Sequence, residues 1–171
     1  MKKFVFLIFW AFVAGLALSS CNVPSVVVAP PPKGVTRFRL NVALVEVAER
    51  TPNNNRWDPG LTEEQMAPDL YYTVAVAGNQ VYKSASVDNK YLTQWLEKSE
   101  VIDVAKGQKI TIAFYDYDAS VARTGMLNNA DDFIGSIDLT ADELIAAAQT
   151  GKELSSGLVK KCKLAIHNLY R

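Results

Sequence analysis

Histidine and cysteine are almost missing from this sequence, and their scarcity removes whole classes of chemistry. The 171 residues include one histidine, His167, and two cysteines, Cys21 and Cys162. A single histidine supplies neither a histidine-rich metal centre nor a Ser-His-Asp triad. The serines that precede Gly157 lack a Gly-x-Ser-x-Gly setting. We therefore expect that the protein is not an enzyme.

Neither sign of charge predominates. There are 18 lysines and arginines and 18 aspartates and glutamates, and two of the basic residues fall within the first 20 positions. The remaining 151 residues carry 16 basic and 18 acidic side chains, a net charge of −2. Such a chain has no basic field for a nucleic acid, so we expect no nucleic-acid partner. Its length suits one hydrophobic core.

The first 21 residues have the pattern of a targeting segment. Lys2 and Lys3 precede an uncharged apolar run from position 4 to 18, which is short for a membrane span and typical of a signal peptide. The end of this segment, Leu18-Ser19-Ser20-Cys21, resembles the bacterial lipobox. That resemblance implies cleavage before Cys21, a diacylglyceryl group on its thiol and acylation of its amine with a fatty acid such as palmitate. The alternative is an ordinary secretory signal with a chance cysteine.

A lipid on Cys21 defines the expected organisation of the chain. Residues 1–20 would be the lipoprotein signal peptide, 21–34 the lipidated cysteine with a proline-rich tether, and 35–171 one domain. Each buried CH₂ contributes about 0.8 kcal/mol, so two or three acyl chains hold a protein on a membrane. Asn22 stands where many inner-membrane lipoproteins of Gram-negative bacteria have aspartate. We therefore expect the outer membrane of a bacterial envelope.

Period-2 alternation predicts an all-β domain. Apolar side chains alternate over 36–49, 70–77, 80–87, 101–104, 110–115, 133–139 and 158–170. One helix is expected from the N-cap Thr140 to the stop at Gly151. Cys162 shares its alternation with the apolar face of the last segment, so we expect a buried, inert thiol, and we place Trp95 in the core. Seven or eight segments of this kind predict an eight-stranded antiparallel β-sandwich with one short helix.

Carboxylates gather where two of these strands meet a loop. Asp116 and Asp118 extend the alternation of the strand that ends near position 115, and Asp131 and Asp132 precede the strand that returns. Like charges this close repel unless a hard cation lies between them, and such oxygen-rich sites suit Ca²⁺. The alternative is that the aspartates only cap turns, a common role in loops.

Two motifs resemble the C2 domain family. Phe114-Tyr115-Asp116-Tyr117-Asp118, followed by the segment 131–139, is similar to the third calcium-binding loop and the next strand of that family. The segment 68–74 (Pro-Asp-Leu-Tyr-Tyr-Thr-Val) resembles its first-loop exit, and the resemblance spans Arg37 to Arg171. It implies a C2-like β-sandwich that binds Ca²⁺ through Asp58, Asp69, Asp116, Asp118 and Asp132.

The two loops depart from the family in length. Eleven positions separate Asp58 from Asp69, and fourteen separate Asp118 from Asp132. Loops absorb added length at small entropic cost, so the insertions concern the bound geometry more than the fold. The expected function is a calcium-binding module of a lipoprotein that recognises phospholipid, a glycan or an envelope protein. The alternative is a calcium-independent structural or protein-interaction sandwich of the cell envelope.

Overall fold

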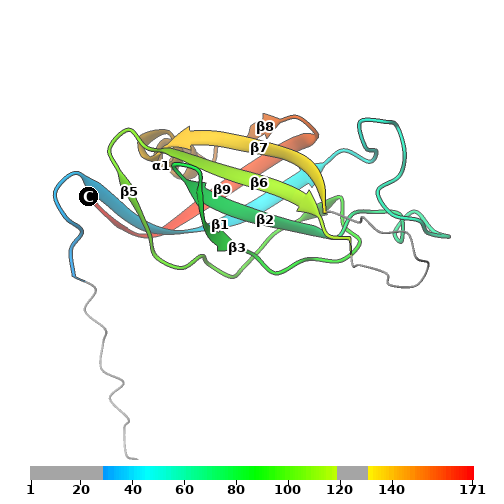
Figure 1. The fold of residues 1–171 in the computed structure, drawn as a ribbon, viewed down its shortest axis with the longest axis horizontal. Coiled ribbons are helices and arrows are strands. Elements are labelled where there is room, and N and C mark those ends of the chain that lie inside the picture. The colour runs from blue at the N-terminus through cyan, green and yellow to red at the C-terminus, as the bar shows by residue number, and fades with distance from the viewer. Residues whose placement is uncertain (1–28, 119–130) are drawn as a thin grey trace, which may run out of the picture.

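The computed structural model describes residues 29–118 and 131–171 (Figure 1). The expectations for Cys21, for the signal peptide and for loop positions 119–130 lie outside these ranges. The described residues form nine strands and one helix. The strands are β1 (Val35–Val47), β2 (Leu70–Val76), β3 (Asn79–Lys83), β4 (Leu92–Thr93), β5 (Ile102–Ala105), β6 (Lys109–Asp116), β7 (Asp132–Thr140), β8 (Leu154–Ser156) and β9 (Val159–Tyr170), and helix α1 (Ala141–Thr150) lies between β7 and β8.

Two antiparallel sheets face each other across one core, which confirms the predicted β-sandwich (Figure 1). One sheet has the order β4-β1-β9-β8 with β5 also paired to β1, and the other has the order β3-β2-β6-β7. The inward positions of each strand follow the alternation of the sequence, as with Phe38, Leu40 and Val42 on β1, all without exposed surface. Fully burying a side chain of this size stabilises the fold by about 1.5–3 kcal/mol.

The longest pairing joins the two ends of the domain. β1 pairs antiparallel with β9, with Val42 opposite Leu164 and Val45 opposite Cys162. Cys162 has no exposed surface, and burial raises the pKa of its thiol to about 12. The predicted burial of Cys162 is therefore confirmed. A sulfur held in its protonated form is a poor nucleophile, so the expectation of an inert thiol stays a prediction.

Helix α1 begins and ends at the predicted caps. Thr140 accepts a hydrogen bond from the backbone N–H of Glu143, whose carboxylate in turn accepts one from the Thr140 N–H, a reciprocal capping box. Gly151 ends the helix in the left-handed region at φ 64°. Leu144 and Ile145 are buried, so the helix closes one end of the sandwich.

Two local expectations differ from the structure. The strand predicted over 80–87 ends at Lys83, where the Tyr72 N–H donates to Ser84 Oγ at 3.0 Å instead of to a backbone carbonyl, although the Ser84 N–H still donates to the Tyr72 carbonyl at 2.9 Å. The chain then returns only at Val87, in an isolated bridge to Leu70. The sequence also did not predict the very short strands β4 and β8. Their two and three residues are too few to show alternation. Trp95 lies in the core as predicted.

The sandwich has two distinct ends. β1 starts at the end that also holds the turn from β5 to β6 and the last residues of β9 (Figure 1). We call it the tether end. The opposite end holds the connection from β1 to β2 and the adjoining ends of β6 and β7, and we call it the acidic end. No helix among the residues that the structure describes is long and apolar enough to cross a membrane.

The close approach of β7 to β8 depends on the absence of a side chain at Gly135. A Cβ there would lie 2.7 Å from the carbonyl oxygen of Ser156 and 3.3 Å from Cγ2 of Val159. Gly135→Ala should therefore lower the free energy of unfolding by about 1–3 kcal/mol, the usual cost of overpacking, in a urea titration. The half-buried neighbour Ser136 supplies the control, because Ser136→Ala adds no atom there. Equal unfolding midpoints for the two variants would contradict the close packing.

Candidate metal centre

The sheet register brings three predicted ligands together at the acidic end. Asp116 is the last residue of β6 and lies opposite Asp132, the first residue of β7. On its other side Asp116 pairs with Leu70, the first residue of β2, which Asp69 directly precedes. Three neighbouring strands thus each have an aspartate at or next to the same end of one sheet. The pairing register of the strands, and not the loops, positions these three carboxylates.

Asp116 is the innermost of these carboxylates. It continues the inward alternation of Ile112 and Phe114 and has no exposed surface. Its Oδ1 accepts the backbone N–H of Asp69 at 2.7 Å. Its Oδ2 is buried, and no hydrogen-bond partner for it lies among the described residues. A buried carboxylate oxygen without a partner is costly, and a bound cation or a proton would satisfy it.

The electrostatics of Asp116 reflect this burial. Burial raises the pKa of Asp116 to about 7, and the N–H of Asp69 opposes that rise. The carboxylates of Asp58, Asp118 and Asp69 raise it further, in that order. A carboxyl group with this pKa exchanges its proton near neutral pH, so a cation competes with protons for the same oxygens.

Asp58 reaches the same end of the sandwich from the long connection between β1 and β2. Trp57, 7 % exposed, lies in the core and donates its indole N–H to the carbonyl of Ala48 at 2.8 Å. This anchored tryptophan places its neighbour Asp58 among the other carboxylates. Burial raises the pKa of Asp58 to about 6, with further repulsion from Asp69, Asp118 and Asp132. The inserted loop therefore does not remove Asp58 from the cluster.

Asp118 and Asp69 complete the set. The pKa of Asp118 is raised by burial first and then by the charges of Asp132, Asp131 and Asp69. Asp69 is held through both its side chain and its backbone, since its Oδ1 accepts the N–H of Asn89 at 2.8 Å and its carbonyl accepts the N–H of Tyr117 at 2.8 Å. All five predicted ligands thus lie near one another.

The carboxylates lie near one another but do not have the arrangement of a metal site. Across residues 29–118 and 131–171, no three His, Cys, Asp or Glu side chains are placed as ligands of one ion. Carboxylates repel one another in the absence of a cation, and rotations of side chains on fixed strand ends would change which oxygens meet. The donor set, all oxygen, and the partnerless Oδ2 of Asp116 fit a hard cation.

Asp131 has a structural partner that sequence reasoning missed. Tyr71 donates its hydroxyl to Asp131 Oδ2 at 2.6 Å, and Lys83 Nζ lies 3.9 Å from the centre of the Tyr71 ring. Tyr71 also stacks on Tyr115 with ring centres 5.2 Å apart. Nothing in the alternation of the sequence indicated that Tyr71 would donate to a carboxylate 60 positions away.

A polar hollow of about 440 Å³ opens beside Asp132. It lies between the long first loop and the start of β7, and its lining includes Arg56, Asn53, Asn55 and the ring of Phe133. Arg56 is also paired with Glu63 within the loop. The three consecutive asparagines were visible in the sequence, but nothing in their spacing placed them next to a candidate ligand.

Comparison with known proteins bears on the fold. No protein-family model and no curated protein matches the chain. Among solved structures, the pair of C2 domains of Extended-Synaptotagmin 2 matches with a TM-score of 0.50 at 20% identity, over 99% of this chain and 48% of that chain. The calcium-bound form of the pair matches with 0.52 at 23% identity, over 81% and 46%. This chain has the fold of a C2 domain.

Human GIVD cytosolic phospholipase A2 is a further structural neighbour, with a TM-score of 0.50 at 15% identity over 78% of this chain and 16% of that chain. The chain described here therefore spans less than half the length of each of these neighbours. The likeness confirms the C2-like sandwich expected from the motifs around Asp69 and Asp116.

The raised pKa of Asp116 predicts how stability depends on pH. Because the folded state holds the Asp116 proton more tightly than the unfolded chain, stability falls as pH rises from the ordinary pKa of 3.8 to about 7. With calcium chelated, the melting temperature should therefore be lower at pH 8 than at pH 5, and Asp116→Asn should reduce that difference. His167, whose pKa burial lowers, acts in the opposite direction in both proteins. An unchanged pH dependence in Asp116→Asn would contradict this assignment.

Proposed function

We propose that this protein is a lipid-anchored, non-enzymatic envelope protein whose C2-like domain binds Ca²⁺ through Asp58, Asp69, Asp116, Asp118 and Asp132. The observation that carries the proposal is the fully buried Asp116, whose Oδ2 has no partner among the described residues and whose pKa is raised by the nearby carboxylates of Asp58, Asp118 and Asp69. Ca²⁺ accepts six to eight oxygen ligands in flexible geometry, which suits carboxylates borne on loops.

The same chemistry suggests what the bound ion would recognise. These carboxylates would hold a cation at the ends of the strands, where it would supply a positive charge for an oxyanion such as a phosphate or a carboxylate. Candidate partners are therefore a phospholipid, an acidic glycan or an envelope protein. The calcium-bound structure of Extended-Synaptotagmin 2 domains supports the calcium assignment by analogy of fold. Outside the cytoplasm, affinities of about 10⁻⁴–10⁻³ M suffice for such modules.

A second candidate, a calcium-independent structural sandwich, is favoured by one specific feature. Asp116 Oδ1 and Asp69 Oδ1 already accept backbone N–H groups, which ties β6, the first-loop exit and the segment around Asn89 together. In this alternative a proton on Asp116 satisfies its second oxygen, and the carboxylates organise loops. A calcium titration separates the two candidates.

The proposed membrane anchor is the lipid on Cys21. Its support is the lipobox-like sequence ending at Cys21, preceded by a charged start and an apolar run. Asn22 favours the outer membrane of the bacterial envelope over the inner membrane.

Calcium binding is tested by calorimetry and melting of the purified protein in detergent. We expect calcium heat at millimolar concentration and a higher melting temperature, because a ligand at 100 times its dissociation constant stabilises the native state by about 2.7 kcal/mol. Asp116→Asn combined with Asp118→Asn should abolish both effects, and magnesium should substitute poorly because it demands octahedral geometry. The matched control is Asp138→Asn on β7, since Asp138 pairs with Lys109 away from the acidic end. Absence of calcium heat in the wild type favours the structural alternative.

The anchor is tested by metabolic labelling with palmitate. The wild-type protein should incorporate the label and partition with membranes, whereas Cys21→Ser should do neither, because serine offers no thiol for the diacylglyceryl group. Continued labelling of Cys21→Ser would refute the assignment of the lipid to this residue.

A further inference from the structure

The polar hollow beside Asp132 has the size and the lining of a small-molecule site. Its volume of about 440 Å³ falls in the range of about 300–1,000 Å³ that is usual for such sites. Trp57 and Phe133 bring aromatic rings to it. Its polar lining consists of Thr51, Asn53, Asn55, Arg56 and Asp132. The hollow therefore combines apolar ring surface with groups that donate and accept hydrogen bonds.

The turn that borders the hollow is closed without its asparagine side chains. The Asn54 N–H donates to the Thr51 carbonyl at 2.9 Å, the Thr51 N–H donates to the Asn55 carbonyl at 3.0 Å, and the Asn55 N–H donates to Thr51 Oγ1 at 3.3 Å. Asn54 has a φ of 63°, a left-handed conformation that asparagine tolerates. None of these bonds uses the carboxamide of Asn53 or Asn55, and both residues are exposed. Their carboxamides are thus available to a ligand.

Phe133 presents an exposed ring in a fixed position. It pairs across the strands with Tyr115, and the two rings meet edge to face with their centres 5.6 Å apart. Tyr115 stacks on Tyr71, and Lys83 Nζ lies 3.9 Å from the centre of the Tyr71 ring. This row of contacts supports the Phe133 ring, yet 55 % of the residue stays exposed. An apolar ring held outside the core offers a surface on which another molecule can stack.

The charges of the hollow disfavour an anion. Arg56 is the one positively charged side chain among the described residues that line it, and its guanidinium already donates to Glu63 at 2.6 Å. Asp132 adds a further carboxylate, so without calcium these three groups carry a net charge of −1. A phosphate or a carboxylate would meet net repulsion there. A neutral hydroxyl is accepted with or without calcium, because Ca²⁺ also takes neutral oxygen ligands.

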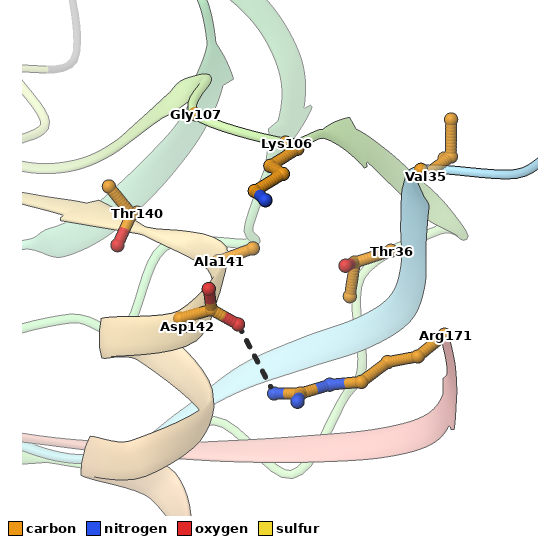
Figure 2. A pocket seen from close by; sticks show the side chains of 9 residues that line it. Val35, Thr36, Lys106, Gly107, Thr140, Ala141, Asp142 and Arg171 are labelled. Carbon is orange, nitrogen blue, oxygen red and sulfur yellow. Dashed lines mark ion pairs between the residues drawn. The ribbon is translucent and has the colours of Figure 1, made fainter.

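The pocket at the tether end lacks this combination. Figure 2 shows Lys106, Asp142 and Arg171 around a smaller space of about 190 Å³. Arg171 pairs with Asp142 at 3.4 Å, and none of the described residues that line this pocket is aromatic. Charged groups without ring surface suit water and ions. The hollow beside Asp132 is therefore the better candidate for an organic ligand.

We propose that the hollow beside Asp132 binds a neutral sugar residue of a glycan. A pyranose ring has an apolar face of C–H groups, which stacks on an aromatic ring such as Phe133. Its hydroxyls both donate and accept hydrogen bonds, which matches the carboxamides of Asn53 and Asn55 and the carboxylate of Asp132. This inference goes beyond the proposed function, because the glycan site borders the candidate calcium site at Asp132 but requires no calcium.

The test measures sugar binding by calorimetry of the full-length protein, with calcium chelated and in a detergent that has no sugar headgroup. The probes are tetrasaccharides of glucose, mannose, galactose and N-acetylglucosamine, with inorganic phosphate as a charged competitor. We expect at least one neutral tetrasaccharide to give heat at millimolar concentration and phosphate not to displace it. Absence of heat with every tetrasaccharide would overturn the proposal, and so would displacement by phosphate or heat that appears only after calcium is added.

Variants locate the site. Asn53→Ala combined with Asn55→Ala should weaken binding about tenfold, because two hydrogen-bonding side chains are lost from exposed positions that the turn does not need. Phe133→Ala should weaken it to a similar extent by removing the stacking surface. The matched controls are Gln80→Ala, an exposed carboxamide on β3, and Leu92→Ala, an exposed apolar side chain on β4, and both should bind as the wild type does. Unchanged affinity in the double asparagine variant would overturn the assignment.

The glycan site and the calcium site fail separately. If calcium heat is present but no sugar binds, the proposed function stands and the glycan site is overturned. If a sugar binds with calcium chelated and no calcium heat is found, the glycan site stands and the calcium-binding function is wrong.

Discussion

The hydrogen bond from the Asp69 N–H to Asp116 Oδ1 is the contact on which the acidic end depends. It joins the last residue of β6 to the residue that enters β2, so two strands and two loops share one fixed point. Because it occupies only one carboxylate oxygen, the second remains buried and without a described partner. Burial makes the charge of this carboxylate costly and raises its pKa, and the hydrogen bond from the Asp69 N–H offsets only part of that rise.

Much of this arrangement was predictable because it follows from alternation. The sequence places Asp116 two positions after Phe114 and therefore on the inward face, and the caps at Thr140 and Gly151 define the helix. Asp116 meets Asp132 at the end of the sheet because a β-bulge between Phe114 and Tyr115 shifts the register with β7 by one residue, which alternation does not predict. The long-range pairing of β1 with β9 follows less directly, since alternation identifies a buried face and does not identify the partner strand.

Other features could not be read from the sequence because they depend on single side chains or very short pairings. β3 ends early where the Ser84 hydroxyl takes a backbone partner, and a hydroxyl at this position is compatible with strand or loop. β4 and β8 have too few residues for any periodicity. The Tyr71 bond to Asp131 joins residues 60 positions apart, and the hollow near Arg56 forms across an inserted loop, so both need three-dimensional neighbours.

The pairing of β1 with β9 has a consequence for the order in which the domain folds. The central strands of one sheet are separated by more than a hundred residues of sequence, so β1, made first, has no main partner until the C-terminus has been made. Such non-local pairing slows folding and delays cooperative closure of the core until synthesis is complete. The sheet that contains β1 is thus completed only late in folding, after the four strands of the other sheet have already been made.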